Sequence, residues 1–176
     1  MAVFWRVGYE NASLDMLMTE MGIARQSLYD TFGDKRSLYL KALAHYRDES
    51  HASMRRVFRS APTAREGFAQ LLFGLSAESR AQHARGCLLL SANLERAAGD
   101  EILAAFLRHN QATVESIFRE ALRRAQSNGE LSRKRDPAAL ARFFVVTIQG
   151  MRALARLKSD RRALEAVARV ALATLD

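Results

Sequence analysis

The sequence predicts an all-α protein: one domain, or one compact domain that carries a small appended module. Ala, Leu, Arg and Glu dominate nearly every stretch, and runs of β-branched residues are missing. Apolar residues recur at spacings of three and four, which is the period of an amphipathic helix. With 176 residues, of which 49% are hydrophobic, the chain is long enough to bury a core.

Capping residues and glycines place four helices in the first third of the chain. Ser13 and Asp34 each precede a helical stretch, where a side-chain oxygen can accept a hydrogen bond from a free backbone amide. Gly8, Gly22 and Gly33 end the stretches before them. We therefore expect helices at residues 2–7, 13–21, 25–31 and 35–58.

The same signals place five helices in the rest of the chain. Thr63 and Glu66 have the spacing of a capping box, and Asp100 and Asp136 are suited to cap the helices that follow them. Pro137 fits the first turn of a helix, where its missing amide hydrogen has no partner to lose. We expect helices at residues 64–79, 86–98, 101–127, 137–157 and 160–175, with a polar connection over 80–85.

The last two expected helices carry wide apolar faces. Their apolar residues recur every three or four positions over 140–154 and 164–175, and Gly150 lies inside the first of these helices. Because a glycine inside a helix costs about 1 kcal/mol relative to alanine, close approach of another helix would account for it. The pair favours a homodimer that forms a four-helix bundle through residues 137–175, the alternative being that both helices pack only on their own core.

Composition and motifs exclude several classes of protein. The single cysteine excludes an internal disulfide framework, and the longest apolar run is too short to cross a membrane. The first residues do not have the pattern of a signal peptide, so we expect a cytoplasmic protein without membrane contact. The four histidines lack metal-ligand spacing, and P-loop, G-x-S-x-G and G-x-G-x-x-G motifs are missing, so we expect neither an enzyme nor a metal or other cofactor.

The net charge of +8 is unevenly distributed along the chain. Residues 1–50 hold six basic and seven acidic side chains, a net charge of −1, so the remaining residues carry +9. A basic protein favours nucleic acid as a partner, but arginines spread at helical spacing are also typical of a solvated surface. The charge alone does not decide between these interpretations.

Residues 13–32 have the layout of a helix-turn-helix. Gly22 lies where the turn needs a permissive backbone. Such a pair holds its second helix outward, where it can enter the major groove of DNA, although similar pairs also occur in proteins that do not bind DNA. Five apolar residues are spaced to bury one face of each helix against the other: Leu14, Leu17, Met21, Ile23 and Leu28.

The segment around these two helices resembles the DNA-binding region of TetR/AcrR-type transcriptional repressors. The resemblance covers residues 4–43 and rests on Gly8-Tyr9 after an aromatic-rich stretch, on Ser13, and on the string SLYDTFGDK from Ser27 to Lys35. It implies a helix-turn-helix DNA-binding module over residues 1–50 and a tetracycline-repressor-like helical bundle for ligand binding and dimerisation over 51–176. Members of that family have a longer first helix, so the first helix is expected to be incomplete here.

The resemblance also implies roles for side chains in this module. Ser13, at a helix N-terminus, together with Tyr29 and Lys35, would contact DNA phosphates and hold the register. Arg25, Gln26 and Ser27 open the recognition helix and would reach base edges, since Arg suits guanine and Gln suits adenine. The implied partner is a palindromic operator in double-stranded DNA, bound by a dimer whose half-sites lie one helical turn or a multiple apart.

The regulatory half would bind a small-molecule effector that releases the repressor from DNA. The sequence does not identify that effector, and apolar residues in this half are equally suited to an ordinary core. The candidates to line a ligand pocket are Phe68, Leu72, Leu89, Asn93, Phe106, His109 and Asn110.

Two alternatives remain open from the sequence. The first is a helical, ligand-binding dimer that has lost DNA binding through a shortened N-terminus. The second is a thiol-based sensor of oxidants or electrophiles at Cys87, which opens an apolar helix beside Arg85, where a thiolate would be favoured. A buried cysteine that acts as a small apolar side chain is the ordinary interpretation of the same residue.

Overall fold

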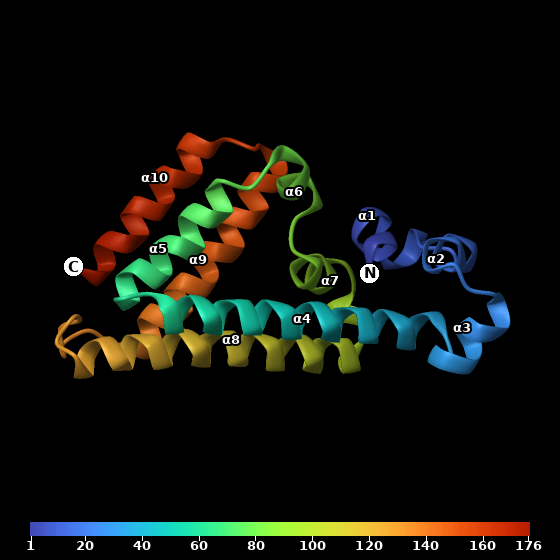
Figure 1. Ribbon diagram of the computed structural model, residues 1–176, viewed down its shortest axis with the longest axis horizontal. Coiled ribbons are helices and arrows are strands. Elements are labelled where there is room, and N and C mark those ends of the chain that lie inside the picture. Colours follow the sequence, from blue (N-terminus) through green and yellow to red (C-terminus); the bar gives the residue numbers. More distant parts are fainter. The chain divides into compact units, whose positions relative to one another are not determined.

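The computed structural model describes residues 1–176, apart from the side chain of Ala97. Its described secondary structure is helical throughout, in agreement with the predicted all-α class (Figure 1). The elements in chain order are α1 (Ala2–Asn11), α2 (Leu14–Met21), α3 (Arg25–Phe32), α4 (Lys35–Ser60), α5 (Ala64–Ser76), α6 (Arg80–Arg85), α7 (Leu88–Arg96), the 3-10 helix η1 (Ala97–Gly99), α8 (Glu101–Ser127), α9 (Pro137–Leu157), α10 (Arg161–Leu172) and the 3-10 helix η2 (Ala173–Leu175).

The chain folds into two compact units. Unit 1 contains Met1–Glu49 and Cys87–Leu107, and unit 2 contains Ser50–Gly86 and Arg108–Asp176. The division into functional domains at residues 50 and 51 stays a prediction. Residues 87–107 lie in the same compact unit as the helix-turn-helix.

Unit 1 has its own hydrophobic core, in which α7 packs on α1. The core is built from side chains of six helices, and Phe4, Leu17, Leu28 and Leu88 are among those fully buried. Gly8 does not end the first helix, as we had predicted, but bends it: its φ of 75° and ψ of 175° interrupt α1, which continues to Asn11. A β-carbon at Gly8 would also lie 3.1 Å from Glu95 Oε2.

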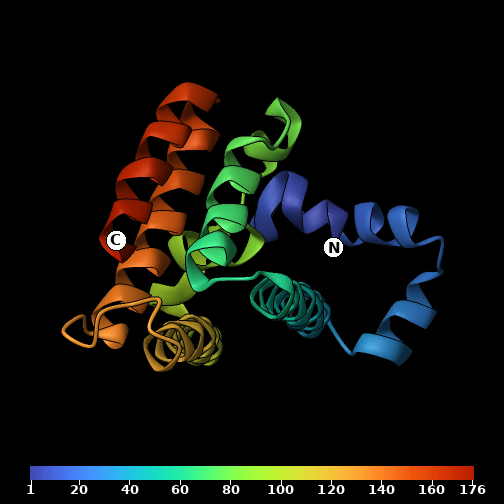
Figure 2. The same cartoon turned by 60° about the vertical axis from the view of Figure 1, so that its left-hand side comes forward.

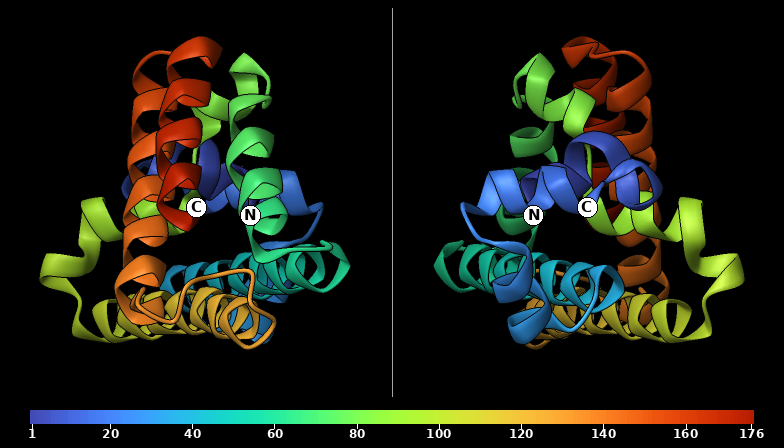
Figure 3. Two further views of the ribbon diagram at one scale, coloured as in Figure 1. Left: turned by 90° about the vertical axis from the view of Figure 1, so that its left-hand side faces the viewer. Right: turned by 90° about the vertical axis from the view of Figure 1, so that its right-hand side faces the viewer.

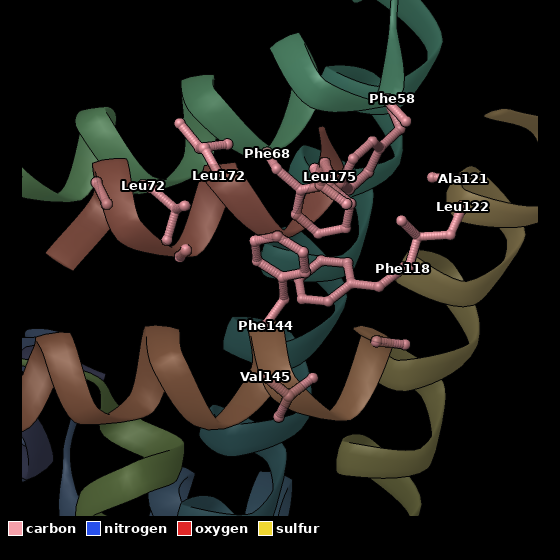
Figure 4. Packing of buried hydrophobic residues seen from close by; sticks show 14 of the residues in the cluster. Phe58, Phe68, Leu72, Phe118, Ala121, Leu122, Phe144, Val145, Leu172 and Leu175 are labelled. Atoms are coloured by element: carbon pink, nitrogen blue, oxygen red, sulfur yellow. The ribbon is translucent and has the colours of Figure 1, made fainter. Parts of the chain in front are cut away.

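Unit 2 packs three helices, α5, α9 and α10, side by side (Figures 2 and 3). Its core is aromatic at the centre, where the Phe68 ring stacks on Phe144 with centroids 3.9 Å apart. Phe58 from α4 and Phe118 from α8 meet Phe68 edge-on, at 4.9 and 5.2 Å (Figure 4). These contacts fix the second half of α4 and of α8 to the helices of unit 2.

Most predicted caps are confirmed. Asp100 accepts a hydrogen bond from the Leu103 amide at 3.0 Å, and Asp136 accepts one from the Ala138 amide at 2.8 Å. The connection that we expected over residues 80–85 is wrong, because it forms α6. That helix begins with a capping box in which Ser79 accepts from the Gln82 amide and the Gln82 side chain accepts from the Ser79 amide.

α9 is more apolar than the sequence analysis allowed for. Within the described residues it is the one helix long and apolar enough to cross a membrane, judged by length and composition alone. One side of α9 is in the core of unit 2, through Ala141, Phe144 and Met151. Other apolar side chains remain exposed on this single chain, including Val146 at 65% and Leu157 at 86%.

Candidate nucleic-acid interface

The helix-turn-helix is formed by α2 and α3, and local sequence fixes both of its ends. Ser13 caps α2 by accepting a hydrogen bond from the Met16 amide at 3.1 Å. Gly22 ends α2 in the left-handed conformation, with φ 64° and ψ 33°, which glycine adopts without the steric cost that a β-carbon brings. Gly33, with φ 79°, ends α3 in the same region of φ.

One side of each helix is held by the core of unit 1. Leu17 from α2 and Leu28 from α3 are buried, at 2% and 1% exposure, and Leu14 and Ile23 are half-buried against the same core. The prediction for Met21 is wrong, because its side chain is 37% exposed next to the turn. The opposite face of α3 is solvent-exposed and carries the polar side chains of its first turn.

The three side chains predicted to reach base edges are all open to solvent. Arg25, Gln26 and Ser27 are all exposed in the first turn of α3. Arg25 forms an ion pair with Asp15 of α2, with Nη2 3.1 Å from Oδ1, and Gln26 donates a hydrogen bond to Asp30 at 2.8 Å. Both donors are therefore held by exposed carboxylates that water or another polar group can replace.

The three side chains predicted to contact phosphates differ in their surroundings. Tyr29 is 40% exposed, and the hydroxyl of Ser13 is engaged in capping α2. Lys35 is half-buried: its Nζ donates to the Glu10 carbonyl oxygen at 3.3 Å and lies 4.5 Å from the centre of the Tyr9 ring. Lys35 thus also connects the first turn of α4 to the end of α1.

Unit 1 contains charged contacts that the sequence analysis did not anticipate. The Arg96 guanidinium lies 4.2 Å from the centre of the Tyr9 ring and is paired with Glu10. Arg36 forms a two-pronged ion pair with Asp100, at 2.8 and 3.1 Å. These partners lie far apart in the chain, so no local pattern could have identified them.

Electrostatics at the start of α4 follow from the same contacts. The Arg36 guanidinium and the Leu103 amide lower the pKa of Asp100 to about 2, against an ordinary value of 3.8. The Ser37 backbone amide lowers the pKa of Asp34, which confirms that Asp34 caps α4. Both carboxylates are therefore structural, and they are ionised near neutral pH.

The predicted ligand-lining residues fall into both units. In unit 1, Leu89 is buried, Phe106 packs half-buried beneath the Arg47 guanidinium, and Asn93 is exposed. In unit 2, Phe68 and Leu72 are fully buried in the core, and His109 is exposed.

Asn110 is the polar candidate with a defined contact in unit 2. Its Oδ1 accepts a hydrogen bond from His51 Nε2 at 2.9 Å. A separate cavity of about 340 Å³ in unit 2 is lined by none of the seven candidates; it lies among Thr63–Arg65, Leu122, Ala125, Glu130, Leu131 and Leu175–Asp176. The ligand-binding role of the seven stays a prediction.

Cys87 lies at the predicted position, directly before α7. Its carbonyl oxygen accepts the first backbone hydrogen bond of that helix, from the Ser91 amide at 3.0 Å. The side chain is half-buried, and the Tyr46 hydroxyl donates a hydrogen bond to its sulfur at 3.7 Å.

The exposed helix α3 is the second helix of a helix-turn-helix, and the chain also forms a second helical unit. This organisation is that of a DNA-binding regulator rather than an enzyme. Known proteins agree: residues 1–42 match "Bacterial regulatory proteins, tetR family", and residues 69–171 match "Tetracyclin repressor-like, C-terminal domain". The chain belongs to the TetR family of bacterial transcriptional regulators.

Individual relatives cover nearly the whole chain. The HTH-type transcriptional regulator YezE of Bacillus subtilis is 31% identical over 99% of this chain and 91% of its own length. The HTH-type transcriptional repressor ComR of Escherichia coli is 27% identical over 99% of this chain and 83% of its own. Among solved structures, a cysteine-substituted variant of the TetR family transcriptional regulator CifR, complexed with 26-base-pair double-strand operator DNA, is 36% identical, with a TM-score of 0.87 over 99% of this chain and 91% of that one.

Proposed function

We propose that this regulator is a cytoplasmic homodimeric repressor that occupies a palindromic operator and is released from it by a small-molecule effector. The observation that carries the proposal is the exposed first turn of α3, in which Arg25, Gln26 and Ser27 are all open to solvent. The complex of CifR with operator DNA, at 36% identity over nearly the whole chain, supports the same mode of binding here.

The side chains of α3 divide into two roles in this proposal. Arg25 and Gln26 exchange Asp15 and Asp30 for base edges in the major groove, where Arg pairs with guanine and Gln with adenine, and Ser27 contacts a neighbouring base. Ser13, Tyr29 and Lys35 contact phosphates and hold the module in register. Base contacts determine which sequence is bound, whereas phosphate contacts strengthen binding to every sequence.

The proposed dimer forms through α9 and α10. Phe143, Val146, Gly150, Leu154 and Leu157 share one exposed face of α9, at helical spacings of three and four. A β-carbon at Gly150 would meet no atom of its own chain within 4 Å, so the glycine leaves room for a helix of a second copy.

The neighbouring face of α10 extends this apolar surface through Val167 and Val170, at 38% and 71% exposure. Two such helices from each protomer make a four-helix bundle. An apolar surface of this kind on a soluble protein is typical of a partner interface.

A small-molecule effector is expected to release the repressor from DNA. We infer that it contacts the regulatory helices, with Phe68, Leu72, Leu89, Asn93, Phe106, His109 and Asn110 as candidates. An effector that binds the DNA-free form more tightly than the DNA-bound form releases the operator in proportion to that difference in affinity.

The division between base and phosphate contacts can be tested by titrating the dimer with two duplexes of equal length. One carries the intergenic DNA upstream of the gene, and the other carries the same bases in scrambled order. Arg25→Ala should reduce the preference for the first duplex by about 1–3 kcal/mol. Tyr29→Phe and Lys35→Ala should weaken binding to both duplexes to a similar extent.

Arg162→Ala serves as the control, since it removes an exposed arginine from α10 and should change neither affinity by more than twofold. Because Lys35 also supports α1, its variant is compared only where its melting temperature equals that of the wild type. Equal losses on both duplexes for Arg25→Ala would contradict the proposed base contact.

A thiol sensor at Cys87 is a second candidate, favoured by the Tyr46 hydroxyl that donates a hydrogen bond to the sulfur. The thiol would add across an electron-poor carbon–carbon double bond of the effector: the sulfur bonds to one carbon, and the thiol proton is transferred through water to the other. Alkylation by N-ethylmaleimide should then release the wild type from DNA but leave Cys87→Ser bound. Release of both proteins, or of neither, would exclude the sensor.

A further inference from the structure

The two units carry opposite net charge. Unit 1, which contains the helix-turn-helix, holds seven basic and ten acidic side chains, a net charge of −3. Unit 2 holds twenty basic and nine acidic side chains, a net charge of +11. The positive charge that would attract a polyanion is therefore concentrated in unit 2, outside the unit that contains the helix-turn-helix.

The cations of unit 2 differ in whether a carboxylate lies within ion-pair distance. Six of them form ion pairs with carboxylates: Arg65, Arg142, Arg152, Lys158, Arg161 and Arg169. Among the side chains that the structure describes, seven without such a pair lie on the second halves of α4 and α8 or in the loop after α8, and we call them the basic end: Arg55, Arg56, Arg59, Arg119, Arg123, Arg133 and Lys134.

The basic end lies on elements that pack together at one end of unit 2. The second half of α4 contacts the second half of α8 through Phe58 and Phe118, whose ring centroids are 5.7 Å apart. Arg124 of α8 donates to the Phe58 carbonyl oxygen, and Glu130, in the loop after α8, accepts from the Ala64 amide at 3.0 Å. Figure 1 shows the end of α4 and the 128–136 loop at the same end of unit 2.

The arginines of α4 face away from the core. Arg55, Arg56 and Arg59 occupy a 100° arc of the helix and are exposed, whereas Phe58 is buried at 4% exposure. On α8, Arg123 is exposed while Leu122 beside it is fully buried. Burial of the apolar side therefore holds a fixed row of guanidinium groups in solvent.

The surroundings of these cations select the kind of polyanion. Protein interfaces bury aromatic and apolar anchors, and single-stranded nucleic acids stack their bases on exposed aromatic rings. In unit 2, the large apolar side chains described as exposed all belong to α9 or α10. The basic end, as described, therefore has neither an exposed apolar anchor nor an exposed aromatic ring. Guanidinium groups without apolar neighbours match the evenly spaced phosphates of a duplex, which they bind in a two-pronged geometry.

We propose that the basic end of unit 2 contacts the phosphate backbone of double-stranded DNA independently of sequence. They supply the attraction for non-operator DNA that unit 1, with its net charge of −3, does not. Because binding to phosphates releases counterions, their signature is a steep dependence of affinity on salt concentration.

The test compares two triple variants of the full chain on a scrambled duplex. Arg55→Gln/Arg56→Gln/Arg123→Gln removes three charges from the basic end, and Arg80→Gln/Arg142→Gln/Arg161→Gln removes three exposed charges elsewhere in unit 2. Arg59 is kept because it lies in the last turn of α4, where a cation stabilises the helix end. Fluorescence anisotropy gives Kd between about 50 and 200 mM salt, the range over which phosphate contacts weaken strongly.

The basic-end variant should bind at least about 10-fold more weakly at the low-salt limit, with a slope of log affinity against log salt that is shallower by about 2 to 3. The control triple should stay within about twofold of the wild type and shift the slope by less than about 1. Both variants are used only if they melt and sediment as the wild type does. Equal losses in the two variants, or none in either, would overturn the proposal.

The result is separable from the function proposed above. Failure of the α3 contacts would appear as lost preference between operator and scrambled duplex in Arg25→Ala. Failure of the basic-end contact would appear as unchanged salt dependence in the basic-end variant, whatever the preference for operator sequence.

Discussion

Asp100 illustrates how one carboxylate joins two helices within unit 1. It caps α8 through the Leu103 amide and receives both prongs of the Arg36 guanidinium from α4. The Asp100 side chain is 10% exposed and that of Arg36 is 42% exposed, so solvent screens the ion pair from the arginine side only. The caps at Ser13, Asp34 and Asp100 were predictable because their hydrogen bonds are local.

Acid should weaken the fold through Asp100. Its pKa in the folded chain, about 2, lies below the ordinary value of 3.8, so the ionised form stabilises the folded state. That contribution is complete above pH of about 4 and is lost as the pH falls toward about 2. In circular dichroism during acid titration, Asp100→Asn should be less stable than the wild type at neutral pH, and the difference should shrink toward pH 2.

The control for this titration is Asp30→Asn, an exposed carboxylate that contacts only Gln26 among the described side chains. It should follow the wild type at every pH. A difference between wild type and Asp100→Asn that stays constant from neutral pH to about pH 2 would show that the charge of Asp100 is not what stabilises α8.

Tyr39 gives the opposite dependence at high pH. Burial, which disfavours tyrosinate, is the main cause that raises its pKa to about 12 from the ordinary 10.0, and Glu95 adds to it. Stability that depends on neutral Tyr39 is complete below pH of about 10 and is lost as the pH rises toward about 12. Ultraviolet titration should show a late tyrosinate signal that is absent in Tyr39→Phe; titration of all tyrosines near pH 10 would contradict this burial.

Ion pairs between residues that are far apart in the chain could not be predicted from the sequence. Arg36 and Asp100 are 64 positions apart, and Arg25 and Asp15 are joined across the turn at Gly22. Each partner alone has the ordinary pattern of a helix surface. Only the fold identifies which carboxylate meets which arginine.

At the scale of the helix, α5 contains a natural matched pair of glycines. Gly67 is buried against α4, and a β-carbon there would lie 2.6 Å from Cδ1 of the Phe58 ring. That ring is held between Phe68 and Phe118 and has little room to move. Gly74 is exposed, and a β-carbon there would meet nothing within 4 Å.

The two glycines should therefore respond in opposite directions to alanine. Gly74→Ala should stabilise the fold by up to about 1 kcal/mol, because alanine favours the helix. Gly67→Ala should destabilise it by about 1–3 kcal/mol, because the clash with Phe58 outweighs that gain. Thermal unfolding of both variants beside the wild type tests this, and a rise in Tm for Gly67→Ala would mean that the Phe58 ring relaxes freely.

Helix boundaries were predictable where the capping residue is obvious, as at Asp136 followed by Pro137. α6 was missed because its cap, Ser79 with Gln82, lies in a polar stretch without apolar periodicity. Met21 was misplaced because spacing alone does not distinguish the last buried turn of α2 from its exposed end. The spacing of Ser79 and Gln82 is a local signal that identifies α6, whereas the exposure of Met21 is decided by the packing of other helices.

At the scale of the whole molecule, the apolar face of α9 and α10 should determine the oligomeric state. Val146→Glu places a charge in the centre of this face and should convert the dimer to a monomer in sedimentation velocity. Leu94→Glu is the matched control, since Leu94 is 75% exposed on α7 and lies outside the face. A dimer that persists in Val146→Glu, or one that dissociates equally in Leu94→Glu, would contradict this interface.

The all-α class, the family and the helix-turn-helix were all predictable, because periodicity, caps and the SLYDTFGDK string are properties of contiguous sequence. The two segments that make up unit 1 were not predictable, because Cys87–Leu107 joins Met1–Glu49 only through the packing of side chains such as Leu88 and Leu103. The charge contrast between the units was equally hidden, because it depends on that division.

Unit 1 is discontinuous in sequence, which limits how this regulator can be truncated or recombined with another. A fragment that stops after Glu49 would leave Phe4, Leu43 and their neighbours without Leu88, Ala92 and Leu103, which complete their core. A chimera that joins the helix-turn-helix to another regulatory domain would therefore have to include Cys87–Leu107. In evolutionary terms, exchange of the whole of unit 1 between regulators requires recombination at the ends of two separate stretches of the gene.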